Sequence, residues 1–100
     1  MSTTTSLITV KKTFTSATVG EPLALVSIPF YSANFYVSTN GCYYGDGTDQ
    51  SLYLPVNSYM DAKNGDLKDF YFINDGVGNT TIICVATVPT KLVQEQLGGL

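Results

Sequence analysis

The residues best suited to acid–base chemistry in this chain are two pairs of aspartates, each pair three positions apart. Asp46 and Asp49 lie in a glycine-rich stretch, and Asp66 and Asp69 flank the start of an expected strand. A glycosidase needs two carboxylates at a fixed separation within a cleft. A chain of 100 residues has little room for such a cleft, and aspartates in turns usually accept hydrogen bonds from nearby backbone. We therefore expect a protein that is not an enzyme.

A calcium site is the second kind of chemistry that these aspartates could support. The stretches 45–49 (GDGTD) and 74–79 (NDGVGN) both offer carboxylate or amide oxygens on a flexible backbone. Calcium takes six to eight oxygen ligands, often from one loop. Neither stretch matches the EF-hand pattern, and Asp-Gly is also a common hairpin signal. We expect plain turns and no cofactor, with Asp46 and Asp49 as the weak candidates for metal ligands and a calcium-stabilised domain as an alternative.

Histidine and cysteine give no support for catalysis. The chain has no histidine, so the commonest general base and the commonest metal ligand are missing. Cys42 therefore has no histidine to activate it as a nucleophile. Cys42 and Cys84 together supply two thiolates, fewer than zinc sites use. We expect both to be buried free thiols rather than a disulfide.

Charge and hydropathy exclude further classes of partner. The net charge is −3, and the basic residues are five lysines with no arginine, so nucleic-acid binding is not expected. No apolar run approaches the roughly 20 residues that span a bilayer. The first residues lack the basic start and apolar core of a signal peptide, so we expect synthesis in a cytoplasm without secretion by a signal peptide.

The aromatic residues are the most distinctive side chains that remain. The chain has seven Tyr and five Phe but no Trp. Tyrosines gather near expected loops, where they could pack in the sheet, form a protein interface or stack on a sugar. The candidates for an interface or recognition surface are Tyr31, Tyr36, Tyr43 and Tyr44. In the stretch 40–50 (NGCYYGDGTDQ), strand alternation predicts that one of the adjacent tyrosines points inward and the other outward.

The elements that would position these residues are almost all strands. Residues with high β-propensity are separated by turn signals at the spacing typical of sandwiches and barrels. Strands are expected at 7–15, 23–28, 34–39, 51–56, 67–73 and 80–88, with turns or loops at 19–22, 40–50, 61–66 and 74–79. The fold class predicted is all-β: a single small antiparallel β-sandwich or jelly-roll-like domain of about 7–8 strands. In 70–73 and 82–86 both faces are apolar, which predicts either central strands or strands covered by a neighbouring subunit.

Both ends of the chain are expected to be arms around a sandwich domain at 7–88. A flexible N-terminal arm is predicted at 1–6, and a C-terminal arm or short helix at 89–100. The helix candidate, 91–97, follows a proline and precedes two glycines, and it is too short to be stable alone. Its apolar residues Leu92, Val93 and Leu97 are therefore further candidates for a protein interface.

The order of these elements resembles that of small β-sandwich structural proteins of bacteriophage and other virus particles, of the head decoration, cement or fibre-base type. The resemblance covers roughly residues 17 to 88. It follows the stretches 19–25 (VGEPLAL), 36–49, 51–58 (SLYLPVNS), 65–73 (GDLKDFYFI) and 80–87 (TTIICVAT). In such proteins the stretch before Asn57 often reads L-x-P-G-x-S, whereas this chain has LPVNS at 54–58.

The resemblance implies a virion protein that binds the particle surface and stabilises it through symmetric contacts. Its partners would be other copies of itself, with a trimer as the guess, and the major capsid protein or another virion protein. The alternative is a small glycan- or receptor-binding module that uses Tyr43, Tyr44 and the loop from Asp46 to Asp49.

Overall fold

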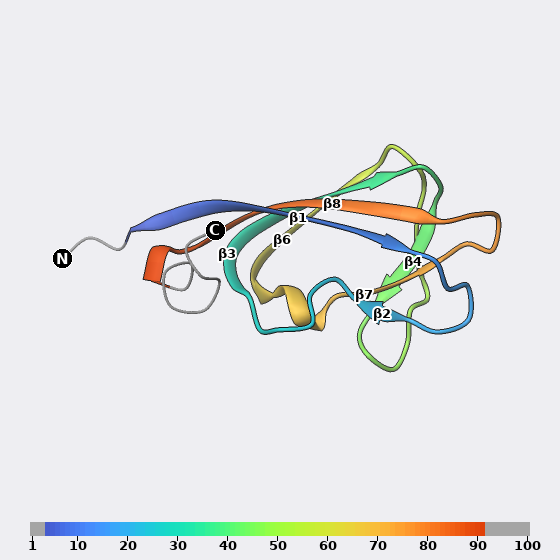
Figure 1. Cartoon of the computed structure of the whole chain (residues 1–100), viewed down its shortest axis with the longest axis horizontal. Helices are drawn as coiled ribbons and strands as arrows, with labels where there is room; N and C mark the ends of the chain where they lie inside the picture. The colour runs from blue at the N-terminus through green and yellow to red at the C-terminus, as the bar shows by residue number, and fades with distance from the viewer. Residues whose placement is uncertain (1–3, 92–100) are drawn as a thin grey trace.

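The computed structural model describes residues 4–91 as two antiparallel sheets that pack face to face, which confirms the predicted small all-β sandwich (Figure 1). Sheet A has the strand order β1 (Thr5–Phe14), β8 (Thr80–Pro89), β3 (Pro29–Ser38) and β6 (Tyr59–Asp66). Sheet B has the order β2 (Glu21–Pro22), β7 (Tyr71–Asn74), β4 (Cys42–Gly45) and β5 (Leu52–Leu54). A short 3-10 helix, η1 (Leu67–Asp69), links β6 to β7. Within 4–91, no helix has the length and apolar character needed to cross a membrane.

Strand alternation places the core between the two sheets. Along β8, the even-numbered residues from Thr80 to Val88 are buried and the odd-numbered residues face away from the core. The register of β8 with β1 runs without interruption from Phe14↔Thr80 to Thr5↔Pro89. Because β8 also pairs with β3, it is a central strand, which was the first of the two alternatives that its apolar faces left open.

Four phenylalanines form the centre of this core. Phe14, Phe35 and Phe72 are fully buried, and they come from β1, β3 and β7. The rings of Phe14 and Phe72 have centroids 5.2 Å apart, and those of Phe35 and Phe70 are 5.0 Å apart. Truncation of such a buried ring to alanine costs about 3–5 kcal/mol, so these contacts hold the two sheets together.

The strand predicted at 23–28 is absent, and this prediction was wrong. The segment is a loop that buries Leu23 and Ile28 but leaves Leu25 82% exposed. Its backbone bonds to two separate places, from Leu23 N to Phe70 O and from Leu67 N to Ile28 O. The segment is therefore an irregular loop with two buried residues, and not the regular strand that its apolar residues indicated.

The loop predicted at 61–66 is also wrong, because these residues belong to β6. The Asn-Gly signal does not mark a turn here. Asn64 has a φ of 56°, and the register of β6 with β3 skips one position between Lys63 and Gly65. Asparagine tolerates this left-handed conformation better than most residues, so the strand continues through it.

The sandwich extends slightly further than its predicted limits at 7 and 88. β1 begins at Thr5 and β8 ends at Pro89, and these two residues pair with each other. Thr90 N donates to Thr4 O at 3.2 Å, and the hydroxyls of Ser6 and Thr90 are 2.8 Å apart. Residues 4–6 and 89–90, which the sequence assigned to the arms, are thus tied to the sheet. The predicted helix 91–97 and its candidates Leu92, Val93 and Leu97 lie outside the described residues, apart from Lys91.

Candidate functional site

The stretch 40–50 contains both a strand and a tight turn. Its first part is β4, in which Tyr44 points inward against Phe72, with ring centroids 6.3 Å apart. Tyr43 points outward and packs on Tyr53 of β5, with centroids 5.1 Å apart. One ring is therefore inward and its neighbour outward, as the sequence predicted. Of the two, only Tyr43 offers its face to a partner.

The loop that follows β4 is organised by Asp46. Its carboxylate accepts hydrogen bonds from Thr48 N, Thr48 Oγ1 and Asp49 N at 2.8–2.9 Å. These bonds, above all the one from the Thr48 backbone, lower the pKa of the Asp46 carboxyl. The carboxylate is thus already occupied by its own turn. Among residues 4–91, no group of three or more His, Cys, Asp or Glu side chains could hold a metal ion.

Glycines shape this loop through close approach rather than through unusual dihedral angles. A Cβ at Gly45 would collide with the Asp49 backbone oxygen, so no larger residue fits there. Gly76, in the turn between β7 and β8, is the glycine with positive φ within the described part of the chain, at 86°. Gly41, Gly45 and Gly47 do not adopt a positive φ.

The two cysteines are buried free thiols in separate sheets. Burial, and secondarily the charge of Asp75, raises the pKa of the Cys42 thiol to about 12. Burial raises the pKa of Cys84 to the same value. Because the thiolate is the nucleophilic form, both side chains act as small core residues at neutral pH.

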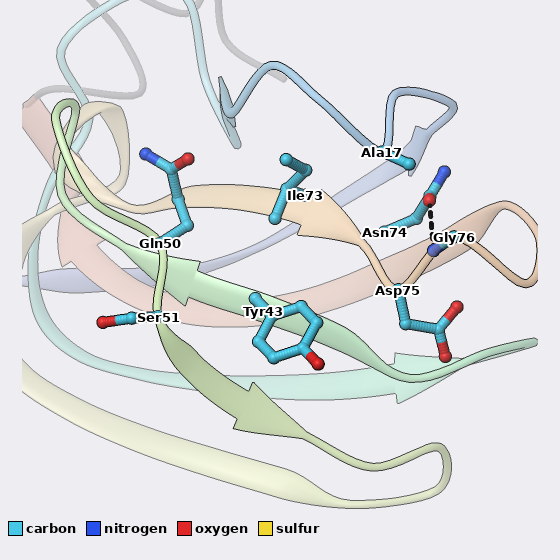
Figure 2. A pocket seen from close by; sticks show the side chains of 8 residues that line it. All are labelled: Ala17, Tyr43, Gln50, Ser51, Ile73, Asn74, Asp75 and Gly76. Atoms are coloured by element: carbon cyan, nitrogen blue, oxygen red, sulfur yellow. Dashed lines mark hydrogen bonds between the residues drawn. The ribbon is translucent and has the colours of Figure 1, made fainter.

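A groove on the outer side of sheet B is the first candidate site (Figure 2). Its volume is about 370 Å³. We call it the sheet B groove, and its lining residues are Ala17, Tyr43, Gln50, Ser51, Ile73, Asn74, Asp75 and Gly76. Tyr43 and Ile73 are opposite each other in the register of β4 and β7 and form an apolar floor.

Polar side chains lie on two sides of that floor. Figure 2 shows Gln50 and Ser51 on one side of Tyr43 and Asp75 on the other. Gln50 Nε2 donates to Asp46 O at 2.6 Å, and Asp75 Oδ1 accepts from Val77 N at 2.9 Å. These bonds hold the two side chains at the margins of the groove. No lysine lines it, so its local charge is negative.

The outer face of sheet A is the second candidate site. Its contiguous apolar residues, which we call the sheet A outer face, are Leu7, Tyr36, Tyr59, Ile83 and Val85. Ile83, Tyr36 and Tyr59 stand in one row across β8, β3 and β6. Leu7 is 73% exposed and Tyr59 is 67% exposed.

Side-chain contacts fix the tyrosine end of this face. The rings of Tyr36 and Tyr59 have centroids 4.9 Å apart, and the Tyr36 hydroxyl donates to Asn57 Oδ1 at 2.7 Å. Beyond Val85 lies a shallow hollow of about 220 Å³ whose lining includes Leu7, Asp61 and Lys63. The surface therefore combines a rigid aromatic edge with a depression and nearby charges of both signs.

The structure does not bring the predicted recognition residues together. Tyr36 lies on the sheet A outer face and Tyr43 in the sheet B groove, whereas Tyr44 is half-buried against the core. Tyr31 is exposed at the position where the β3–β6 register skips, level with Asn64. Sequence reasoning missed Leu7, Tyr53 and Tyr59, although an apolar residue at an outward position of a strand is the signal that could have found them.

This arrangement can bind a partner through apolar and aromatic contacts. No protein-family model matches the chain, and a search of curated proteins finds no match either.

Proposed function

We propose that this chain is a non-enzymatic structural protein of a virus particle, of the capsid decoration or cement type. It binds the particle surface through protein–protein contacts and stabilises the assembled shell. The observation that carries the proposal is the sheet A outer face, where exposed Leu7 and Val85 line one hollow and the row of Ile83, Tyr36 and exposed Tyr59 lies next to it. Contiguous exposed apolar surface of this kind marks interaction sites.

The proposed occupant of this face is the shell protein. The rigid tyrosine pair offers contact area at low entropic cost, and the hollow beside Val85 can receive an apolar side chain. Asp61 and Lys63 at the margin offer opposite charges that would set the register of the contact. The sequence resemblance to particle-surface proteins over roughly residues 17 to 88 supports the same assignment. In this proposal the protein is located in the virion.

The test is co-sedimentation of the purified protein with particles of the virus whose genome encodes it. The copies of the protein that these particles already carry are removed first. Wild-type protein should bind in a saturable manner, with a fixed number of copies per shell. Val85→Lys should abolish the binding, because it places a charge in the centre of the face.

Val77→Lys is the matched control. Val77 is more exposed than Val85 but lies in the β7–β8 turn, away from the sheet A outer face. This variant should bind as wild type does. Equal binding by all three proteins, or no saturable binding by the wild type, would contradict the proposal.

The sheet B groove supports a second candidate, a glycan-binding module. A sugar ring could stack its apolar face on Tyr43 while its hydroxyls bond to Ser51 and Asp75. The absence of cationic side chains from the lining favours a neutral sugar over an anionic one. On this account, a neutral oligosaccharide shifts the amide NMR signals of residues 73–76. Tyr43→Ala should remove these shifts, whereas Tyr59→Ala, on the opposite sheet, should keep them.

A further inference from the structure

The four edge strands of the sandwich are not equally protected against pairing. β2 has two residues and contains Pro22, and β5 has three residues and is followed by Pro55. β6 carries the left-handed Asn64 and the skipped position in its register. Short strands, prolines and local kinks are the usual means by which sheet edges avoid pairing with other chains. Three of the four edges therefore have such protection.

β1 lacks these three features, and the charged residues that it carries are Lys11 and Lys12. It has ten residues, contains neither glycine nor proline, and keeps one unbroken register with β8. Among the described residues, no strand pairs with its other side. A long, regular edge of this kind is a template for one more strand.

The backbone hydrogen-bond pattern shows which groups that edge presents. Thr90 N donates to Thr4 O, so Thr4 and Thr90 form a hydrogen-bonded pair in the β1–β8 ladder. Such pairs alternate with non-bonded pairs in antiparallel strands. The even-numbered residues of β1 consequently bond to β8, and the odd-numbered ones direct their N–H and C=O groups away from it: Thr5, Leu7, Thr9, Lys11 and Thr13.

A second observation supports the same alternation between residues of β1 that bond to β8 and residues that face away from it. Val37 N donates to Ser58 O, so the odd-numbered residues of β3 bond towards β6. The even-numbered residues of β3 therefore bond towards the odd-numbered residues of β8, with which they are paired. That leaves the even-numbered residues of β8 for β1, in agreement with the bond from Thr90.

We propose that β1 pairs with β1 of a second copy of this chain, antiparallel about a two-fold axis at Thr9. The odd-numbered residues then face each other, with Leu7 opposite Lys11 and Thr5 opposite Thr13 of the second copy. This register uses the whole strand. The two A sheets become one continuous sheet of eight strands.

Side-chain chemistry favours this register over one centred on Lys11. Leu7, which is 73% exposed, is covered by the aliphatic stem of Lys11 of the second copy. A register centred on Lys11 would instead place two lysines opposite each other, and like charges at that position destabilise a sheet. Lys12 is not an obstacle, because its Nζ donates to Pro22 O at 2.7 Å within its own subunit.

The inward side of the strand fits the same arrangement. Ile8 is buried and Val10 is partly buried against the core. In the dimer, Ile8 of each copy would face Val10 of the other copy across the axis. The apolar core would then continue from one sandwich into the next. This pairing does not depend on attachment to a particle, so it can hold or fail independently of the proposed function.

Light scattering behind a sizing column, over a concentration series of the full chain, tests the pairing. Wild-type protein should shift from monomer to dimer as concentration rises. Leu7→Lys places a new lysine side chain opposite Lys11 twice in each dimer and should raise the dissociation constant roughly tenfold. Leu7→Lys combined with Lys11→Glu restores opposite charges at both places and should recover the dimer.

Thr87→Lys is the matched control, because Thr87 is the neighbour of Leu7 on the central strand β8. It adds the same charge to the same face without touching the edge, and it should leave the dimer unchanged. Circular dichroism would establish that each variant is folded.

The register itself is tested by oxidation of single-cysteine variants. Thr9→Cys places two cysteines opposite each other on the axis, at a Cα separation of about 5.5 Å, which a disulfide can bridge. It should form covalent dimers, whereas Thr13→Cys should not, because Thr13 faces Thr5. A monomer at every concentration, a trimer, a dimer that Leu7→Lys does not weaken, or equal cross-linking by Thr9→Cys and Thr13→Cys would each overturn the proposal.

Discussion

At the scale of single residues, the Asp66 carboxylate connects segments that are far apart in the sequence. It accepts hydrogen bonds from the Ser27 hydroxyl, from Ile28 N at 2.8 Å and from Lys68 N at 2.9 Å. Burial acts to raise its pKa, but the bonds from Ser27, Lys68 and Ile28 together outweigh it, so the pKa is lowered. Asp66 thereby caps η1 and fixes the end of the 23–28 loop.

Replacement of Asp66 by alanine should lower the free energy of unfolding by about 1–2 kcal/mol, because one capping bond and two further bonds are lost. The loss should depend on pH. Since the folded pKa lies below the ordinary value of 3.8, the contribution of Asp66 is complete well above pH 4 and is lost as the pH falls through the folded value. Urea unfolding of both proteins between pH 2 and pH 7 would measure it.

Asp61→Ala is the control for this prediction. Asp61 is exposed and its carboxylate accepts one bond, from Asn34 Nδ2 at 2.7 Å. Its removal should change stability by less than about 0.5 kcal/mol. If the two variants were equally stable at pH 7, the structural role given to Asp66 would be wrong.

Single residues also show how far sequence reasoning reaches. Strand alternation alone predicted that Tyr43 and Tyr44 point to opposite sides, and the absence of histidine directed attention away from catalysis. Two of the bonds of Asp66 were not predictable, because Ser27 and Ile28 approach it across 39 and 38 positions of the chain. Hydrogen bonds between distant segments depend on the fold, and no local pattern encodes them.

At the scale of elements, β6 shows why a local signal can mislead. The Asn-Gly pair at 64–65 is the commonest short signal for a hairpin turn, yet here it lies inside a strand. Pairing with β3 on both sides of the skipped position holds the chain extended. Tertiary pairing therefore overrides the turn preference in β6. The segment 23–28 is a loop because its two ends, Leu23 and Ile28, are buried and bonded to separate places.

The conformation of Asn64 gives a prediction at this scale. Asn64→Val should destabilise the fold by about 1–2 kcal/mol, because a β-branched residue fits the left-handed region poorly. Lys63→Val is the control: Lys63 is exposed on the same strand and lacks a positive φ, so its change should stay within about 0.5 kcal/mol. Thermal unfolding of the two variants side by side would decide, and equal melting temperatures would show that Asn64 bears no special conformation.

At the scale of the whole molecule, the two sheets have different outer surfaces. Sheet A is built of long strands and exposes an apolar face and the open edge of β1. Sheet B has short strands and carries the groove around Tyr43. If two copies join through β1, their A faces form one broad platform, whereas the grooves remain separate. The molecule is thus suited to attach by sheet A and to leave sheet B accessible.

In the function proposed above, attachment stabilises the shell by mass action. A protein that binds the assembled lattice but not the free shell subunits contributes RT ln(1 + [L]/Kd), about 2.7 kcal/mol per site when its free concentration is 100 times Kd. Many symmetric sites add their contributions. The stabilisation should therefore increase with the concentration of free protein.

The most direct test is the temperature at which particles stripped of this protein release their nucleic acid, measured with a fluorescent dye while the protein is added back. The account predicts a release temperature that rises with the logarithm of the free protein concentration once the sites are filled. Val77→Lys should give the same rise, and Val85→Lys should give none. A release temperature that wild-type protein leaves unchanged at saturating concentration would contradict the account.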